Sequence, residues 1–296
     1  MVVSIGNLVV GGAGKSQVAL LLAKELAENR LKVAILSRGY KGTNEKGKRP
    51  LLIDPKIHPP SLCGDEAWML ASRLPEVAVI AGRDRYRSSF EAKREGAQVA
   101  LLDDGMQHRK LHRDIEIVVC DSRDPLGGGE LLPKGRLRDE PSHLAKAHYV
   151  LLVGPKVEGT GERIAKWTHA PQIEMEIGVE EVVGWKGSLH EVPVGVFCGI
   201  GNPSRFIGTV KSQGARVVAE EFLSDHQKMG EKRLQKFAEK AKEKGAELLL
   251  CTEKDVVKLP KNPLLPLPLG WVKVSLQVRE NRETWEEMKK RIARSV

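Results

Sequence analysis

The residues best suited to chemistry lie in a short loop near the start of the chain, Gly11-Gly12-Ala13-Gly14-Lys15-Ser16. Small residues allow backbone N–H groups to curl around a phosphate, and the N-terminus of a following helix adds a favourable dipole. A lysine in such a loop reaches the β- and γ-phosphates of a nucleotide, and the serine hydroxyl can ligate Mg²⁺. The loop therefore predicts an ATP phosphate site, although Val9 stands where the standard pattern has glycine.

A pair of carboxylates could complete this site. Asp103 and Asp104 directly follow the apolar run 99–102, which places them at the end of a predicted strand. The carboxyl end of a strand beside a phosphate loop is where Mg²⁺ finds a protein ligand or an acceptor for its bound water. A simple Asp-Gly turn gives the same pattern, but the nearby phosphate loop favours the metal interpretation. We therefore predict Ser16, Asp103 and Asp104 as metal-site residues.

Apolar strands and amphipathic helices alternate around these residues. The run 2–5 predicts a buried strand, and 15–28 predicts a helix with one apolar face. Such alternation predicts an α/β fold of the P-loop NTPase type, in which a parallel sheet carries helices on both faces. Further strands are predicted at 32–36, 77–81, 99–102 and 115–120, and further helices at 64–74 and 83–95.

The second half of the chain predicts another α/β unit. Glycine and proline clusters at 124–129 and 132–135 make the middle of the chain loop-rich. We predict a phosphate-binding domain over residues 1–170 and a second, smaller α/β domain over 171–296, whose last helix is free to pack back on the first. Strands are predicted here at 194–198, 216–219 and 248–251, and helices at 203–213, 231–244 and 282–294.

The composition narrows the class of protein. The 296 residues are 41% apolar, which suffices for a core without metals or disulfides, and the four widely spaced cysteines suit a reducing cytosol. No apolar run approaches membrane-spanning length. The net charge of +9 would attract nucleic acid, anionic lipid or phosphorylated ligands. Aromatic residues make up only 4%, which argues against a protein that stacks on bases.

An ordered series of short motifs resembles one known family. After the phosphate loop come Ser37-Arg38-Gly39-Tyr40-Lys41-Gly42, Gly64-Asp65-Glu66, Asp84-Arg85-Tyr86 and Asp103-Asp104-Gly105-Met106-Gln107-His108-Arg109. Later come Leu132-Pro133-Lys134-Gly135, Leu137-Arg138, Gly199-Ile200-Gly201-Asn202-Pro203, Asp225-His226 and Thr252-Glu253-Lys254-Asp255. This series runs from residue 2 to about residue 260 and resembles the tetraacyldisaccharide 4'-kinase family, the lipid A 4'-kinases.

The resemblance implies a kinase with two α/β domains and an active site between them. Its reaction transfers the γ-phosphate of ATP, with Mg²⁺, to the 4'-hydroxyl of a tetraacyldisaccharide 1-phosphate. By motif, Asp65 and His226 correspond to the family's catalytic pair, and Lys15 acts with them on the phosphates. The aspartate would accept the proton of the hydroxyl, and the histidine would orient the aspartate or tune its pKa.

Further residues are implied to contact the substrate. Arg85 and Arg138 match arginines whose planar guanidinium suits phosphate recognition. Arg38 and His108 complete the expected set of substrate or phosphate contacts. The family motif usually has an aromatic residue where this chain has Met106, and this chain carries an extra acid, Asp139, before Glu140-Pro141.

The same resemblance implies a location. Because the substrate is a glycolipid, we expect peripheral contact with anionic lipid on the cytoplasmic face of the inner membrane, and no nucleic-acid partner. Family members usually carry an apolar segment before the first strand, and the printed sequence starts at that strand. We therefore expect exposed lysines and arginines to provide the membrane contact.

Two other classes of function fit part of the sequence. The phosphate loop also resembles those of regulatory or partitioning ATPases with a deviant P-loop, but Val9 and Val10 stand where their signature lysine lies. A basic nucleic-acid-binding protein would account for the net charge. That class gives no role to Asp65 or to the carboxylates at 103–104.

Overall fold

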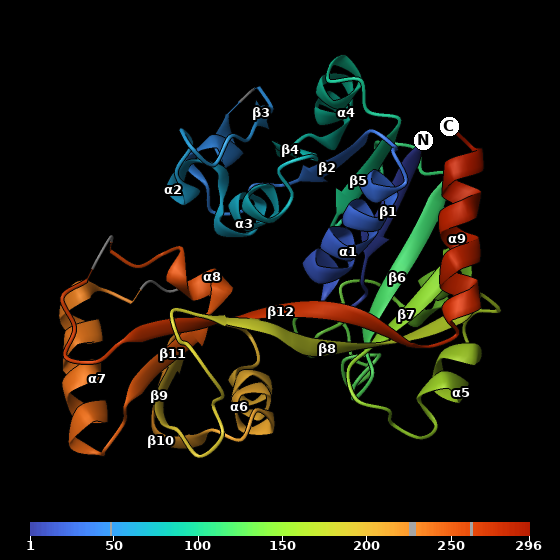
Figure 1. The fold of residues 1–296 in the computed structure, drawn as a ribbon. Helices are drawn as coiled ribbons and strands as arrows, with labels where there is room; N and C mark the ends of the chain where they lie inside the picture. Colours follow the sequence, from blue (N-terminus) through green and yellow to red (C-terminus); the bar gives the residue numbers. More distant parts are fainter. Residues whose placement is uncertain (48, 225–228, 261–262) are drawn as a thin grey trace. The chain divides into compact units, whose positions relative to one another are not determined.

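The computed structural model describes residues 1–47, 49–224, 229–260 and 263–296. Its contacts divide the chain into unit 1, Met1–Ile177 with Leu276–Val296, and unit 2, Gly178–Ser275. Two long strands, β8 (Gln172–Val183) and β12 (Leu269–Glu280), carry the chain out of unit 1 and back into it (Figure 1). The division into two domains, residues 1–170 and 171–296, stays a prediction.

Unit 1 is built on a sheet with the strand order β8-β7-β6-β1-β5-β2-β4-β3. The pairs are parallel, except that the short edge strand β3 runs antiparallel to β4. The carboxyl ends of the parallel strands therefore share one edge of the sheet. The strands are β1 (Val2–Gly6), β2 (Val33–Ser37), β3 (Leu51–Leu52), β4 (Ala78–Ala81), β5 (Val99–Asp103), β6 (Ile115–Asp121) and β7 (Tyr149–Val153).

Helices cover both faces of this sheet, as the sequence predicts. Along β2, Val33 and Ile35 belong to the core cluster that α1, α3 and α9 complete, whereas Ala34 and Leu36 belong to a second cluster with α4. This alternation follows from the two-residue period of a strand. The helical segments are α1 (Lys15–Glu28), η1 (Thr43–Lys46), α2 (Pro60–Cys63), α3 (Asp65–Arg73), α4 (Arg85–Arg94), η2 (Pro141–Lys146), α5 (Thr160–Ala165) and α9 (Arg282–Arg294).

The last helix, α9, packs on α1 within unit 1. The indole Nε1 of Trp285 donates to Glu25 Oε2 at 2.8 Å, and Lys289 Nζ lies 2.7 Å from the same carboxylate oxygen. Trp285, Met288 and Ile292 form the buried stripe that their spacing predicts. The helix thus closes one face of the sheet that carries the phosphate loop.

Unit 2 holds a second parallel arrangement, with the strand order β10-β9-β11-β12. Helix α6 covers the cluster that contains Val194, Val196 and Leu250, and α7 covers the cluster that contains Phe197 and Leu249. The elements are β9 (Pro193–Cys198), α6 (Pro203–Ser212), β10 (Arg216–Phe222), α7 (Glu231–Glu243), β11 (Leu248–Thr252) and α8 (Glu253–Val256). Strands β3, β7, β8 and β12 were not predicted from the sequence.

The strand that feeds the phosphate loop ends in a glycine for a steric reason. A Cβ on Gly6 would overlap Met106 Cβ and lie 2.9 Å from Met106 N, because the turn after β5 crosses directly over this position. We expect Gly6→Ala to lower the free energy of unfolding by about 1–3 kcal/mol, the usual cost of overpacking. Denaturant titration measures this cost. Gly12→Ala is the control, because no atom lies within 4 Å of its added methyl group. Equal stability of the two variants would contradict the close approach.

Candidate functional site

The phosphate loop connects β1 to α1 at the carboxyl edge of the unit 1 sheet. Gly14 precedes the helix with φ 95°, and a Cβ there would lie 3.2 Å from Val153 Cγ1, so glycine suits both its backbone and its space. Gly11 and Gly12 are exposed, and a methyl group added to either would have no atom within 4 Å. The loop thus presents open backbone at a helix N-terminus, the arrangement that binds phosphate.

A cluster of opposite charges stands beside the loop. Lys15 Nζ lies 3.0 Å from Asn7 Oδ1 and 3.5 Å from Asp104 Oδ1. Arg138 donates through both terminal nitrogens to the Asp104 carboxylate, at 2.8 and 3.0 Å, and also donates to the Asn7 side chain. Two cations therefore converge on one carboxylate and one amide oxygen. This is the concentration of positive charge that a nucleotide phosphate requires.

Asn7 is a site residue that the sequence did not reveal. It is buried, with 1% of its surface exposed, and its Nδ2 donates to Val9 O at 2.6 Å. Its backbone oxygen accepts from Gln107 Nε2 and from Arg138 Nη2, both at 3.1 Å. The residue joins the phosphate loop to the segments around 107 and 138. Its position shortly before the phosphate loop was the one indication that the sequence offered. The spacing of residues along the chain does not predict which side chains pair in the fold.

The two adjacent carboxylates occupy different environments. Asp103 lies opposite Ile5 in the β1–β5 register and is 4% exposed; its Oδ1 has no hydrogen-bond partner among the described residues. Burial, reinforced by the negative charges of Glu66 and Asp104, raises the pKa of Asp103 to about 7. Burial would also raise the pKa of Asp104, but hydrogen bonds and charge from Arg138 and Lys15 outweigh it and lower this pKa to about 2.

Glu66 is a second site residue that the sequence did not single out. It stands in the first turn of α3, and Ser16 Oγ donates to its Oε2 at 3.3 Å. Its charge also contributes to the raised pKa of Asp103, so the two carboxylates lie near each other. In the sequence, Glu66 was marked only by its position next to Asp65 in the Gly64-Asp65-Glu66 motif. Within this motif, the family resemblance assigned a role, in proton transfer, to Asp65 alone.

Asp65 is positioned by close contact between two glycine-containing loops. It begins α3 after Gly64, whose φ is 89°, and it is half-buried. A Cβ on Gly42 would lie 2.6 Å from Gly64 N, so the loop after β2 packs directly on the start of α3. Asp65 and the phosphate loop both belong to unit 1. Its predicted partner, His226, lies outside the described residues.

The three other predicted phosphate contacts differ in exposure. Arg38 is half-exposed, with Nε 2.7 Å from Glu45 Oε1. Arg85 is 4% exposed and donates to the backbone oxygens of Gly82, Arg83 and Asp103 at 3.3–3.4 Å. Burial lowers the pKa of Arg85, against the charges of Asp103 and Asp104.

His108 lies close enough to Arg85 to be affected by its charge. Burial, with Arg85 as the next cause, lowers the pKa of His108. Its Nε2 is buried and has no hydrogen-bond partner among the described residues. The site residues of unit 1 thus follow the carboxyl ends of β1, β2, β4 and β5, or come from the start of α3 and, for Arg138, from the segment between β6 and η2. Roles for Arg38, Arg85 and His108 in phosphate binding stay predictions.

Neither a preformed metal cage nor a membrane-spanning helix is present in the described residues. They contain no group of three or more His, Cys, Asp or Glu side chains arranged to hold a metal ion. In the same part of the chain no helix is long and apolar enough to cross a membrane.

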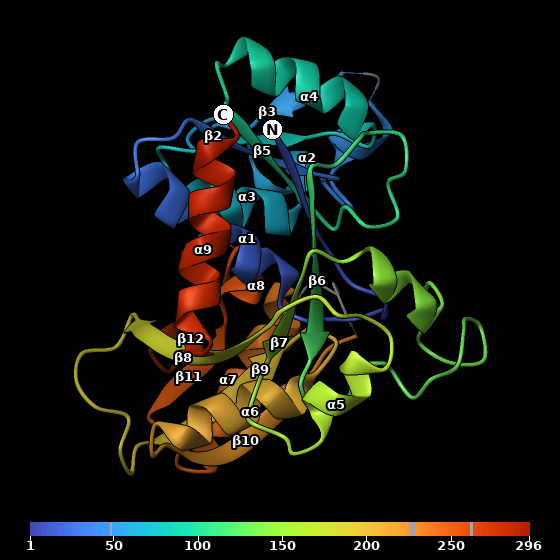
Figure 2. The ribbon, with the colours of Figure 1, turned by 90° about the vertical axis from the view of Figure 1, so that its right-hand side faces the viewer.

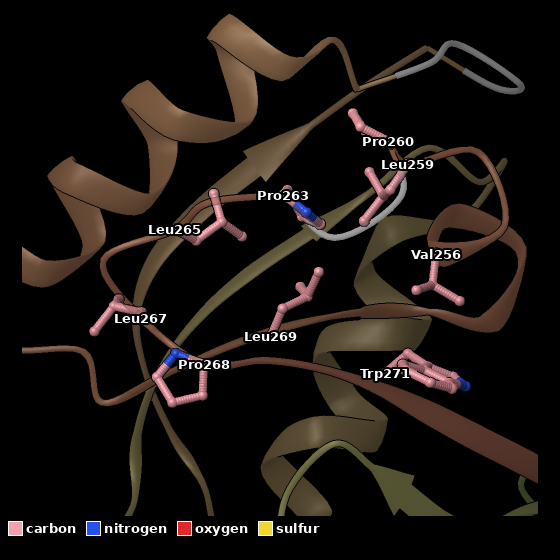
Figure 3. A pocket seen from close by; sticks show the side chains of 9 residues that line it. All are labelled: Val256, Leu259, Pro260, Pro263, Leu265, Leu267, Pro268, Leu269 and Trp271. Atoms are coloured by element: carbon pink, nitrogen blue, oxygen red, sulfur yellow. The ribbon is translucent and has the colours of Figure 1, made fainter.

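An apolar pocket of about 420 Å³ lies within unit 2 (Figure 3). Four leucines, three prolines, Val256 and Trp271 line it. It has no charged or nucleophilic side chain in its lining, so we assign it no chemistry.

Comparisons with known proteins give consistent results. A family model described as "Tetraacyldisaccharide-1-P 4'-kinase" matches residues 1–293. A tetraacyldisaccharide 4'-kinase from Chlamydia pneumoniae is 39% identical over 290 residues, which cover 95% of this chain and 79% of that protein. The corresponding protein from Chlamydia trachomatis is 40% identical over 266 residues, 87% of this chain and 72% of that protein.

A solved structure resembles the fold over nearly the whole chain. It is that of LpxK from Aquifex aeolicus in complex with ATP, with a TM-score of 0.75 and 29% sequence identity. The match covers 98% of this chain and 88% of the other.

Proposed function

This chain belongs to the tetraacyldisaccharide 4'-kinase family, and on that premise we propose that it transfers the γ-phosphate of ATP to the 4'-hydroxyl of a tetraacyldisaccharide 1-phosphate, a step of lipid A biosynthesis. The family resemblance predicted from the sequence is confirmed. The family match over residues 1–293 also argues against the two alternative functions, a partitioning ATPase and a nucleic-acid-binding protein. The observation that carries the proposal is the phosphate loop with Lys15, Arg138 and Asp104 gathered beside it.

Each residue has a role that its surroundings support. Lys15 and Arg138, held by Asp104 and Asn7, would direct their remaining N–H groups to nucleotide phosphate oxygens, and so stabilise charge that develops on transfer. Asp65 would accept the proton of the attacking hydroxyl, because it begins α3 in the same unit as the loop. His226 would assist Asp65. Arg38, Arg85 and His108 would contact phosphates or acceptor.

A divalent cation would fit the oxygen atoms around Ser16. The serine hydroxyl, Glu66 and the unpartnered Oδ1 of Asp103 are the hard ligands that Mg²⁺ takes, and Mg²⁺ commonly completes its shell with water and substrate phosphates rather than a full protein cage. When bound there, Mg²⁺ would neutralise charge on the phosphates. Because Arg138 and Lys15 already engage Asp104, we assign Asp103 to the metal and Asp104 to orienting the two cations.

We expect Glu66→Gln to raise the Mg²⁺ concentration needed for half-maximal activity by about tenfold, the smaller end of effects seen when a group near a metal is lost. Activity measured across a Mg²⁺ titration gives this value. Glu91→Gln is the control, because Glu91 pairs with Arg94 on α4 and not with Ser16. An unchanged Mg²⁺ requirement in Glu66→Gln would remove this residue from the proposed metal site.

The function itself is tested by ADP release. A kinase consumes ATP only as fast as it finds acceptor, so ADP release should depend on added disaccharide 1-phosphate. Rapid ADP release without acceptor would favour an ATPase instead.

We also propose peripheral contact with the cytoplasmic face of the inner membrane. The acceptor's acyl chains would reside in the bilayer, and the net charge of +9 favours anionic lipid.

A further inference from the structure

A projecting loop next to the phosphate loop carries apolar side chains that are exposed to solvent rather than buried. Residues 128–134, between β6 and η2, are all exposed. Figure 2 shows the connection that follows β6 as a green loop extending outward from unit 1. Leu131 is 42% exposed and Leu132 53% exposed, and exposed Pro133 follows them. We call Leu131, Leu132 and Pro133 the apolar tip.

The apolar tip is braced rather than loose. Leu137 forms a β-bridge with Val9 on one side and with Leu131 on the other. Leu132 N donates to Leu137 O at 2.9 Å, and Gly135 N donates to Leu131 O at 2.9 Å. Leu137 itself is 1% exposed and belongs to a core cluster with Leu8. The buried Leu137, which lies between the segments of Val9 and Leu131, therefore anchors the tip to the interior.

The same bracing ties the tip to the phosphate loop. Val10 N donates to Arg136 O at 2.7 Å, and Arg138 N donates to Leu8 O at 2.6 Å. Val10 is itself 45% exposed, so a fourth apolar side chain is exposed, on the segment paired with 136–137. These backbone hydrogen bonds thus fix the position of the apolar tip relative to the phosphate loop.

Two exposed ion pairs flank the tip. Lys134 and Arg136 follow it, with 78% and 57% of their side chains exposed. Their acidic partners are Glu130 and Asp124, so these pairs are at the solvent-exposed surface. Exposed apolar side chains beside polar, ion-paired groups suit the boundary between headgroups and acyl chains, where either cation could exchange its carboxylate for a lipid phosphate.

We propose that the apolar tip inserts into the interface of an anionic bilayer and so holds the phosphate loop at the plane where an acylated acceptor lies. This inference rests on the proposed function for the identity of the acceptor, but the binding itself does not. It adds an apolar contact to the electrostatic attraction expected from the net charge. Membrane binding should accordingly be weakened by salt yet persist in part when charges are screened.

The test compares two equally exposed apolar side chains. Leu132→Glu places a charge in the tip, and Phe90→Glu places one on α4, where Phe90 is also 53% exposed. Co-sedimentation uses vesicles of phosphatidylcholine with phosphatidylglycerol, across a salt series. We expect Leu132→Glu to weaken binding by about tenfold or more and to abolish the salt-resistant part, with little change for Phe90→Glu. Leu132→Trp should strengthen binding, because tryptophan favours this interface.

Several results would overturn the proposal. Equal loss in Leu132→Glu and Phe90→Glu would mean a nonspecific effect of charge, and wild-type binding by Leu132→Glu would mean that the tip does not insert. Thermal unfolding checks that both variants are folded.

A kinetic measurement separates a third possibility. With acceptor dispersed in detergent, Leu132→Glu should have the wild-type kcat and KM, whereas with acceptor in vesicles its turnover should fall. A raised KM in detergent with unchanged vesicle binding would mean that the tip contacts one acceptor's acyl chain, and would contradict the proposal. Inactivity of the wild-type protein in detergent would count against the proposed function and leave the sedimentation result standing.

Discussion

Replacing Lys15 with alanine should reduce kcat about a thousandfold or more while the protein stays folded. The ammonium group is 3.0 Å from Asn7 Oδ1 and 3.5 Å from Asp104 Oδ1, so these two side chains orient it. A cation fixed in this way stabilises charge as it develops on the transferred phosphoryl group, without reorganisation at the moment of reaction. Alanine retains the helix, because it is the most favourable residue in a helical position.

Steady-state kinetics with saturating acceptor measures this loss, and circular dichroism checks the fold. Lys24→Ala is the matched control, because Lys24 is an exposed lysine of the same helix, α1. A folded Lys15→Ala variant with near-normal turnover would refute the phosphate-loop assignment.

Loss of the catalytic pair should have the second large effect. An aspartate of ordinary pKa is a weak base for an alcohol, but proton loss comes late in a loose transition state, so a well-placed carboxylate coupled to a histidine suffices. We expect Asp65→Ala and His226→Ala each to lower kcat by about 10²–10⁴-fold, the usual range for general acid–base groups. The affinity for ATP should change little, because Lys15 and the loop backbone bind the phosphates.

The double variant distinguishes a pair from two independent residues. Residues that act as a unit are non-additive, so the double variant should be little worse than the more damaged single variant. Glu76→Ala serves as the control, since Glu76 is an exposed carboxylate just beyond the other end of α3. If the two losses simply multiply, Asp65 and His226 act separately and another base must be sought.

The strand–loop–helix unit that carries the phosphate loop could be predicted because it depends on local rules. A glycine-rich loop before an amphipathic run predicts a strand–loop–helix unit, and helix Lys15–Glu28 has the predicted bounds. Helix Arg282–Arg294 likewise matches its prediction. In both helices the buried face follows directly from residue spacing.

The parts that were missed depend on contacts between distant segments. Tyr149–Val153 is a short apolar run that becomes β7 because β6 and β8 lie on either side to pair with it. Asn7 and Arg138 are 131 positions apart in the chain, and only the fold places the guanidinium on the amide.

Environment also decides what equal residue types do. Asp103 and Asp104 are indistinguishable in sequence, yet burial raises the pKa of one and Arg138 and Lys15 lower that of the other. Glu66 joins the site only because α3 begins opposite Ser16.

The most direct test of the account is the position of the transferred phosphate. The protein is incubated with γ-labelled ATP and a tetraacylated glucosamine disaccharide 1-phosphate, and the labelled product is analysed by NMR. The account predicts a new phosphate monoester on the 4'-oxygen of the distal sugar, with the anomeric phosphate unlabelled. Label found only as inorganic phosphate, or on any other oxygen of the acceptor, would contradict it.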